Sequence, residues 1–161
     1  MSTLFHKVSL NQFALAYKDN NVENIYNDIK LPQRATKGSA GYDFFAPFDF
    51  TLKPNETITI PTGIRCEMDE NRVLMIFPRS GLGFKYRMQL NNTVGIIDSD
   101  YFYSDNEGHI FIKITNNTNE DKVIEVKKGQ GFAQGLFMQY FLTDDDDASA
   151  IRNGGFGSTT K

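Results

Sequence analysis

Residues 78–85 read PRSGLGFK and place an arginine, a hydroxyl and two glycines directly after an apolar segment. Exposed backbone amides at the start of a helix, together with the Arg79 guanidinium and the Ser80 hydroxyl, can bind an anion such as a phosphate. The same residues also suit an ordinary strand-to-helix turn in which Ser80 caps the helix. Alone, this motif leaves both interpretations open.

Two acids and a tyrosine follow the apolar step of NNTVGIIDSDY at residues 91–101. A carboxylate at the end of a buried strand can be held rigidly beside a pocket, where it orients a water molecule or accepts its proton. Asp98 is the candidate for this role, and Tyr101 can be a platform for a sugar or a base. The alternatives are a simple Asp-Ser-Asp turn and a tyrosine that packs in the core.

The chain ends in AIRNGGFGSTTK, residues 150–161, which contains few side chains able to build a core. This tail is not a P-loop, because no lysine directly precedes Ser158 and no room is left for a following helix. Its glycines therefore either approach a ligand closely or belong to a disordered segment.

Short strands must position these motifs. From residue 40 onward, apolar segments alternate with turn-forming residues, which is typical of β-structure. Many short strands at even spacing predict an all-β fold, a jelly-roll-like β-sandwich or barrel, with one short helix over residues 80–88. The expected strands lie at residues 57–60, 73–77, 109–115, 123–126 and 136–141.

The first 35 residues form an N-terminal extension with a weaker pattern. They predict a strand around HKVSLNQFAL, residues 6–15, and then a short helical or irregular piece that stops at Pro32. With 161 residues and ordinary apolar content, the chain fits one domain spanning 1–161.

Composition excludes several classes of partner. The net charge of −3 argues against nucleic-acid binding through a broad basic face, which needs clustered Lys and Arg. Cys66 is the single cysteine and cannot form an internal disulfide, and the apolar run FALAY at residues 13–17 is too short to span a membrane. We therefore expect a cytoplasmic protein with no membrane partner.

Five motifs, in this order and at these separations, resemble those of the trimeric dUTP pyrophosphatase (dUTPase) family over residues 37–159. They are AGYDFFAP at 40–47, PRSGLGFK at 78–85, NNTVGIIDSDY at 91–101, KKGQGFAQGLF at 127–137 and RNGGFGST at 152–159. The resemblance implies a β jelly-roll subunit in a homotrimer with shared active sites. It also implies that residues 150–161 form a flexible C-terminal arm that closes over nucleotide at a neighbouring subunit.

The resemblance further implies the reaction. A water molecule positioned by Asp98 attacks the α-phosphorus of dUTP, and the products are dUMP and pyrophosphate. This reaction limits uracil incorporation into DNA and supplies dUMP for dTTP synthesis. Mg²⁺ is expected on the triphosphate oxygens and water, so no protein side chain is assigned to the metal.

Residue roles follow from the same resemblance. Tyr101 packs under the deoxyribose and leaves no room for a 2′-hydroxyl, while Asp43 supports the geometry of the site through Arg79. Uracil and deoxyribose are contacted by Asn92, Gly95, Ile97 and Tyr101. The phosphates are contacted by Arg79, Ser80, Gly81, Gln134, Arg152, Phe156, Gly157, Ser158 and Thr159.

The chain departs from the family pattern at three places. After Tyr101 the family commonly has Arg-Gly, whereas residues 102–109 of this chain differ and include extra residues. In the fourth motif, Gln130 and Gly131 replace a charged pair. The tail motif is one residue shorter than the common family motif. The contacts of the 102–109 loop cannot be carried over from the family.

Two other functions are weighed against this one. A dCTP deaminase, or a bifunctional deaminase and diphosphatase, shares the fold but uses a glutamate on the strand after the catalytic loop, where this chain has Lys113. A non-catalytic β-sandwich binding module would be expected to lose Asp98, Tyr101 or Arg152, and all three are present.

Overall fold

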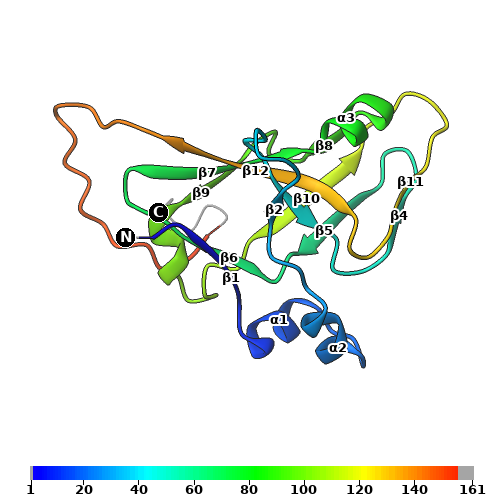
Figure 1. Cartoon of the computed structure of the whole chain (residues 1–161), viewed down its shortest axis with the longest axis horizontal. Helices are drawn as coiled ribbons and strands as arrows, with labels where there is room; N and C mark the ends of the chain where they lie inside the picture. The colour runs from blue at the N-terminus through cyan, green and yellow to red at the C-terminus, as the bar shows by residue number, and fades with distance from the viewer. Residues whose placement is uncertain (1, 156–161) are drawn as a thin grey trace.

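The computed structural model describes residues 2–155 (Figure 1). Four phosphate-binding candidates, Phe156, Gly157, Ser158 and Thr159, lie outside the described residues. Within the described part the chain is mostly antiparallel β-structure with a few short helices, as the sequence predicts.

The largest sheet carries or adjoins most of the candidate residues. Its five strands lie in the order β2-β3-β12-β7-β9, and every neighbouring pair is antiparallel. The strands are β2 (Gln33–Arg34), β3 (Tyr42–Phe45), β12 (Gly131–Gln139), β7 (Arg72–Pro78) and β9 (Gly95–Asp98).

Smaller sheets complete the β-structure. One has the order β5-β10-β8, and two are pairs, β11 with β4 and β1 with β6. Their strands are β5 (Thr57–Pro61), β10 (Phe111–Asn116), β8 (Met88–Leu90), β11 (Ile124–Val126), β4 (Phe50–Leu52), β1 (Leu4–Lys7) and β6 (Ile64–Glu67).

The predicted strands are confirmed apart from their ends, and the largest shift is in β12. This strand begins at Gly131 rather than near residue 136, because its glycines are interior strand residues and not turn residues. At Gly135, an added Cβ would lie 2.9 Å from both Leu74 Cδ1 and Phe44 Cε2. Glycine is needed here for close packing within the core.

The strand predicted over residues 6–15 is wrong beyond Lys7. Strand β1 ends there, and helix α1 (Leu10–Ala16) follows after Ser9, whose Oγ accepts a hydrogen bond from the Gln12 backbone amide at 3.1 Å. A serine that satisfies an otherwise free amide of the first turn favours a helix start over continued strand. A second helix, α2 (Val22–Asn27), occupies the piece predicted to be helical or irregular.

Helix α3 (Ser80–Tyr86) confirms the helix predicted over residues 80–88, but not its cap or its end. The N-cap residue is Arg79, without a side-chain capping bond, so Ser80 is the first helical residue. The helix ends before Met88 because Arg87 adopts a left-handed conformation with φ of 51°. A short 3-10 helix, η1 (Ser99–Tyr103), follows β9.

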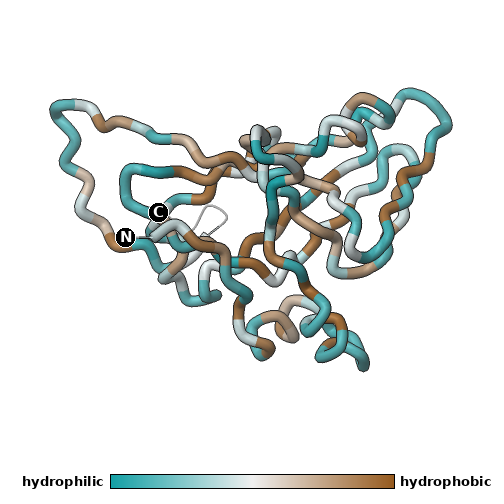
Figure 2. The backbone as a smooth tube through the Cα atoms, viewed as in Figure 1, coloured by the Kyte–Doolittle hydropathy of each residue, from teal (hydrophilic) through white to brown (hydrophobic). Residues whose placement is uncertain are grey.

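The core joins the N-terminal extension to the sheets. Val8 and Phe13 are fully buried and belong to the same cluster as Phe44, Leu74 and Ile114. Hydrophobic residues follow the packed strands, whereas the turn before β11 is hydrophilic (Figure 2). None of the described helices combines the length and the apolar composition that a membrane crossing needs.

Candidate active site

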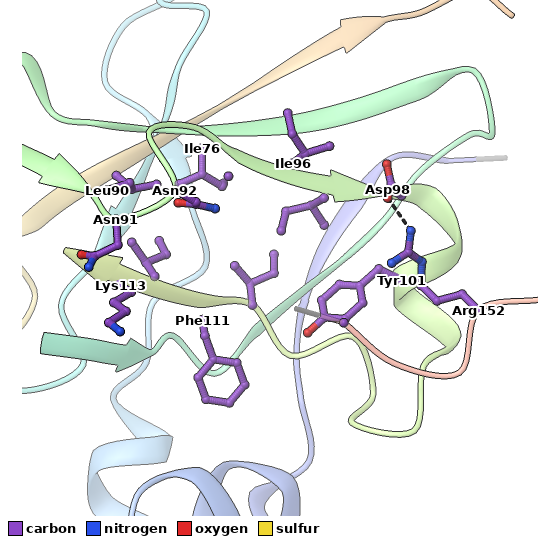
Figure 3. Close-up of a pocket in the computed structure, with 15 residues that line it drawn as sticks. Ile76, Leu90, Asn91, Asn92, Ile96, Asp98, Tyr101, Phe111, Lys113 and Arg152 are labelled. Atoms are coloured by element: carbon purple, nitrogen blue, oxygen red, sulfur yellow. Dashed lines mark hydrogen bonds and ion pairs between the residues drawn. The ribbon is translucent and has the colours of Figure 1, made fainter. Parts of the chain in front are cut away.

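A cavity of about 340 Å³ lies between the β8–β9 segment (residues 88–98), strand β10 and helix η1. The structure brings five of the predicted site residues from the 91–101 motif and one from the tail to its walls. These are Asn92, Gly95, Ile97, Asp98, Tyr101 and Arg152. Asn91 and Asn92 lie at one end of the cavity, and Asp98 and Arg152 lie at the other (Figure 3).

The β8–β9 segment that forms one wall depends on a tight turn and on the close approach of β9 to β7. Thr93 has a positive φ of 67° in the turn, and the Val94 amide donates to the Asn92 carbonyl at 2.7 Å. Gly95 pairs with Ile76 of β7, and an added Cβ at Gly95 would lie 3.0 Å from the Ile76 Cβ. Strand β9 can therefore lie against β7 and present Asp98 at its end.

Asp98 contacts Arg152 at the open end of the cavity. The Arg152 Nη2 atom lies 2.5 Å from Asp98 Oδ2, and Arg152 Nε donates to Asp100 Oδ1 at 2.7 Å. The Asp98 side chain is 47% exposed, so part of its carboxylate faces solvent. One planar guanidinium thus joins two carboxylates, and charge-assisted hydrogen bonds of this kind fix orientation well.

The segment around Arg152 folds back onto the pocket of its own chain. The Asp105 amide donates to the Asn153 carbonyl at 3.4 Å, and an added Cβ at Gly155 would lie 2.6 Å from Tyr101 Cε2. A glycine is therefore needed where the arm crosses the tyrosine ring.

Tyr101 is buried, and its hydroxyl is held by the loop that follows. The hydroxyl donates to the His109 carbonyl at 2.6 Å and accepts from Asn106 Nδ2 at 2.8 Å. Burial raises the pKa of Tyr101, although Asn106 and Arg152 oppose the change. The phenol therefore stays neutral, and these bonds fix the ring at the wall of the cavity.

A second group of candidates lies elsewhere on the same sheet. Arg79 Nε is 3.3 Å from Asp43 Oδ1, and Gln134, which pairs with Asp43 across β12 and β3, donates to the Pro78 carbonyl at 3.1 Å. Gly131 leaves space for Arg79, because an added Cβ would lie 2.9 Å from Arg79 Nη1. The expected Asp43–Arg79 pair is thus present.

The cavity residues around Asp98 and the candidates around Arg79 lie at opposite ends of β7. Asp98 pairs with Val73, whereas Arg79 follows the last residue of that strand. Six residues of extended chain span roughly 20 Å at about 3.3 Å per residue. Neither Arg79 nor Gln134 lines the cavity, and Figure 1 shows α3, with Ser80 and Gly81 in its first turn, away from β9 and η1.

The sequence pattern of the dUTPase family matches residues 27–160. The chain belongs to the dUTPase family.

Relatives and solved structures agree with this membership. The chain is 42% identical over 134 residues to the deoxyuridine 5′-triphosphate nucleotidohydrolase of Lactococcus lactis, a match that covers 81% of this chain and 88% of the relative. The crystal structure of the Streptococcus mutans dUTPase superposes with a TM-score of 0.67 at 32% identity, covering 87% of this chain and 98% of that one.

A more distant structure shares the fold of this dUTPase-family chain. It is a mutant dUTPase from phage phi11 of Staphylococcus aureus, whose structure reveals the coordination of a structural Mg(II) ion. The TM-score is 0.66 at 18% identity, with 93% of this chain and 98% of that chain covered.

Sequence reasoning missed some of the pocket of this dUTPase-family chain. Asn91, Ile96 and Phe111 also line the cavity. Strand β10 was predicted, but its pairing with β8, in which Ile114 lies opposite Leu90, joins distant segments. No local pattern reveals such a pairing, so the face that β10 gives to the cavity could not be assigned.

Two charged residues of the cavity, Lys113 and Asp98, bear on which reaction this dUTPase-family chain could catalyse. Lys113 lines the wall at the position where the deaminase alternative requires a glutamate, and Asp98 is the one carboxylate among the described lining residues. Within residues 2–155, no group of three or more His, Cys, Asp or Glu side chains is placed to hold a metal ion.

Proposed function

We propose that this chain hydrolyses dUTP to dUMP and pyrophosphate, with Asp98 positioning the water that attacks the α-phosphorus. The observation that carries the proposal is the place of Asp98, the one carboxylate among the described residues that line the cavity. It ends a strand fixed against β7 and keeps part of its carboxylate exposed. A carboxylate held in this way can orient a water molecule and accept its proton.

Nucleoside selection is assigned to the β8–β9 segment and the tyrosine ring. The β8–β9 segment contributes Asn92, Gly95 and Ile97 to the wall that would contact uracil, and the Tyr101 ring would lie under the deoxyribose. Because a closed wall rejects larger ligands by steric clash, the methyl group of thymine and the 2′-hydroxyl of UTP would both be excluded.

Phosphate binding is assigned to a neighbouring subunit of a homotrimer. The separation of Asp98 from Arg79 by roughly 20 Å along β7 places the two groups too far apart to contact one triphosphate in one chain. Arg79, Ser80, Gly81 and Gln134 of one subunit would complete the pocket of another, with Asp43 orienting Arg79. Arg152 and the arm would then close over the phosphates.

Mg²⁺ is placed on the substrate. The described residues do not offer a cluster of metal ligands, and a triphosphate supplies oxygen ligands of the kind that Mg²⁺ prefers. We therefore treat Mg–dUTP as the substrate. The protein residues bind the nucleotide and orient the water molecule.

The test measures pyrophosphate release from dUTP, dTTP, dCTP and UTP with Mg²⁺, in wild type and in a chain truncated after Ala150. We expect strong preference for dUTP and a large loss without the arm. Ammonia release from dCTP, measured in parallel, would support the deaminase alternative. Absence of turnover with every nucleotide would instead favour the binding module. Sedimentation of the same wild-type sample tests the trimer.

A further inference from the structure

The N-terminal extension, residues 1–35, is integral to the fold, although its first 26 residues lie outside the family match. Strand β1 pairs with β6, and Phe13 of α1 is fully buried. The Phe13 ring lies against Gly63, where an added Cβ would be 3.3 Å from its Cδ2 atom, and 6.2 Å from the His109 ring centroid. This segment therefore packs directly on the end of the 99–109 loop.

A pair of hydrogen bonds joins this extension to the same loop. The Ser9 backbone amide donates to Glu107 Oε2 at 2.7 Å, and the Ser9 hydroxyl donates to Glu107 Oε1 at 2.6 Å. Both carboxylate oxygens are thus bound by one residue 98 positions away. Because the Ser9 hydroxyl also accepts from the Gln12 amide, helix α1 fixes its orientation.

Glu107 lies between the two residues that hold the Tyr101 hydroxyl. Asn106 donates to that hydroxyl through its side chain, and His109 accepts from it through its carbonyl. Gly108 completes the link, because an added Cβ there would lie 2.6 Å from the Tyr101 carbonyl oxygen. The position of Glu107 therefore determines the positions of both groups that fix Tyr101.

The backbone at Glu107 is strained and needs a restraint. Glu107 has φ of 59° and Gly108 has φ of 69°, and the left-handed region is unfavourable for a glutamate. Partial burial alone would raise the pKa of Glu107, but the two bonds from Ser9, followed by Arg65 and His109, lower it below its usual value. The carboxylate therefore stays ionised at neutral pH and accepts both bonds from Ser9.

We propose that the N-terminal extension braces the 99–109 loop through the Ser9–Glu107 pair, and that Ser9 and Glu107 are positioning residues for the nucleoside-binding ring of Tyr101. The inference rests on the proposed function in one respect, since that function identifies the ligand of Tyr101. The brace itself is a relationship within the chain and can be measured without substrate.

The test compares wild type with Glu107→Ala, Ser9→Ala and the double variant. We expect Glu107→Ala to raise KM for dUTP by about 3- to 10-fold, which corresponds to one net hydrogen bond, and to leave kcat within about 2-fold. The double variant should weaken dUTP binding by less than the sum of the two single effects in free energy, because either substitution alone already breaks the pair. Amide hydrogen exchange of residues 101–109 should be faster in each variant.

Two controls separate the brace from general loosening of the extension. Asp28→Asn breaks the ion pair in which Lys128 Nζ lies 2.5 Å from Asp28 Oδ2, a contact that ties the extension to the turn before β12. It should leave KM and exchange of residues 101–109 unchanged. Ser9→Thr keeps the hydroxyl and the helix cap and should restore KM close to wild type.

A wild-type KM in Glu107→Ala, or an equal rise in Asp28→Asn, would overturn the brace. If the wild-type protein does not hydrolyse dUTP, the proposed function fails and hydrogen exchange alone decides. Faster exchange of residues 101–109 in Glu107→Ala would then support the brace, and unchanged exchange would overturn it.

Discussion

Arg152 forms an ion pair with Asp98 across 54 residues of sequence, with 2.5 Å between Nη2 and Oδ2. The same guanidinium contacts Asp100, so the tail is bound to one carboxylate at the end of β9 and to another in η1. A triphosphate concentrates more negative charge than these two aspartates and would compete for the guanidinium. We expect nucleotide binding to transfer Arg152 to the phosphates and to release the Asp98 carboxylate for its water molecule.

Replacing Asp98 with Asn should abolish most of the activity. The amide keeps the size of the side chain but cannot accept a proton from water, so we expect kcat for dUTP to fall about 100- to 10,000-fold. Pyrophosphate release measures the loss. Asp100→Asn is the matched control, because Asp100 also contacts Arg152 but does not line the cavity. An equal loss in Asp100→Asn would contradict the role given to Asp98.

Arg152→Lys should not retain the full activity of the native arginine. A lysine has one compact charge, whereas the guanidinium of Arg152 contacts two partners in a planar fork. We expect Arg152→Ala to lower kcat/KM for dUTP on the order of 100-fold, as for the loss of one donor that stabilises charge in the transition state. Arg152→Lys should recover only part of this loss. Full activity in Arg152→Lys would show that a single positive charge is sufficient.

Substitutions of Tyr101 should separate the ring from the hydroxyl. Tyr101→Phe removes the bonds to the His109 carbonyl and to Asn106, so we expect the free energy of unfolding to fall by about 1–3 kcal/mol. The ring persists, and the preference for dUTP over UTP should persist with it. Tyr101→Ala should lose that preference. Urea unfolding and parallel assays with both nucleotides measure the two effects, and loss of the preference in Tyr101→Phe would refute this division.

His109 should make the fold acid-sensitive. Burial lowers the pKa of His109 from 6.5 to about 4, with Glu107 acting in the opposite direction. Between these pH values the unfolded chain binds more protons than the folded chain, so the free energy of unfolding should fall as pH decreases from about 6.5 to 4. The loss should approach the order of 3 kcal/mol.

The matched variant for this pH effect is His109→Gln. In wild type, His109 Nε2 accepts from the Gly63 amide at 2.9 Å, and a glutamine oxygen can accept there without titrating. Urea unfolding at pH 7.5, 6 and 5 should give a smaller decrease in this variant. Because the pKa of Glu107 is lowered, its contribution is lost only at lower pH, below about 4.5. Equal decreases in wild type and His109→Gln would exclude His109 as the cause.

The sequence predicts those parts of the site that depend on local order. Asn92, Asp98 and Tyr101 lie within ten residues of one another, and a turn, strand β9 and helix η1 bring them to one cavity. The Asp43–Arg79 pair was also expected, because both residues belong to recognisable motifs.

Contacts between distant segments could not be predicted in the same way. No motif in the sequence contains His109, but in the fold its ring lies 6.2 Å from the Phe13 ring, centroid to centroid, and its Nε2 atom accepts from the Gly63 amide. At the start of α1 a local signal did exist, since Ser9 and Gln12 match the S-x-x-Q pattern of a helix start. The link from Ser9 to Glu107 had no such signal, because it exists only after the extension has packed on the loop.

The family match begins at residue 27, yet Val8, Phe13 and Ile25 are buried with the rest of the core. A recombinant fragment cut at the limit of homology would uncover the surface that Phe13 fills and leave β6 without its partner β1. Such a fragment should be prone to aggregation, because an unpaired strand and an exposed apolar patch would lie side by side. In this chain the unit that the family pattern matches is therefore shorter than the unit that folds.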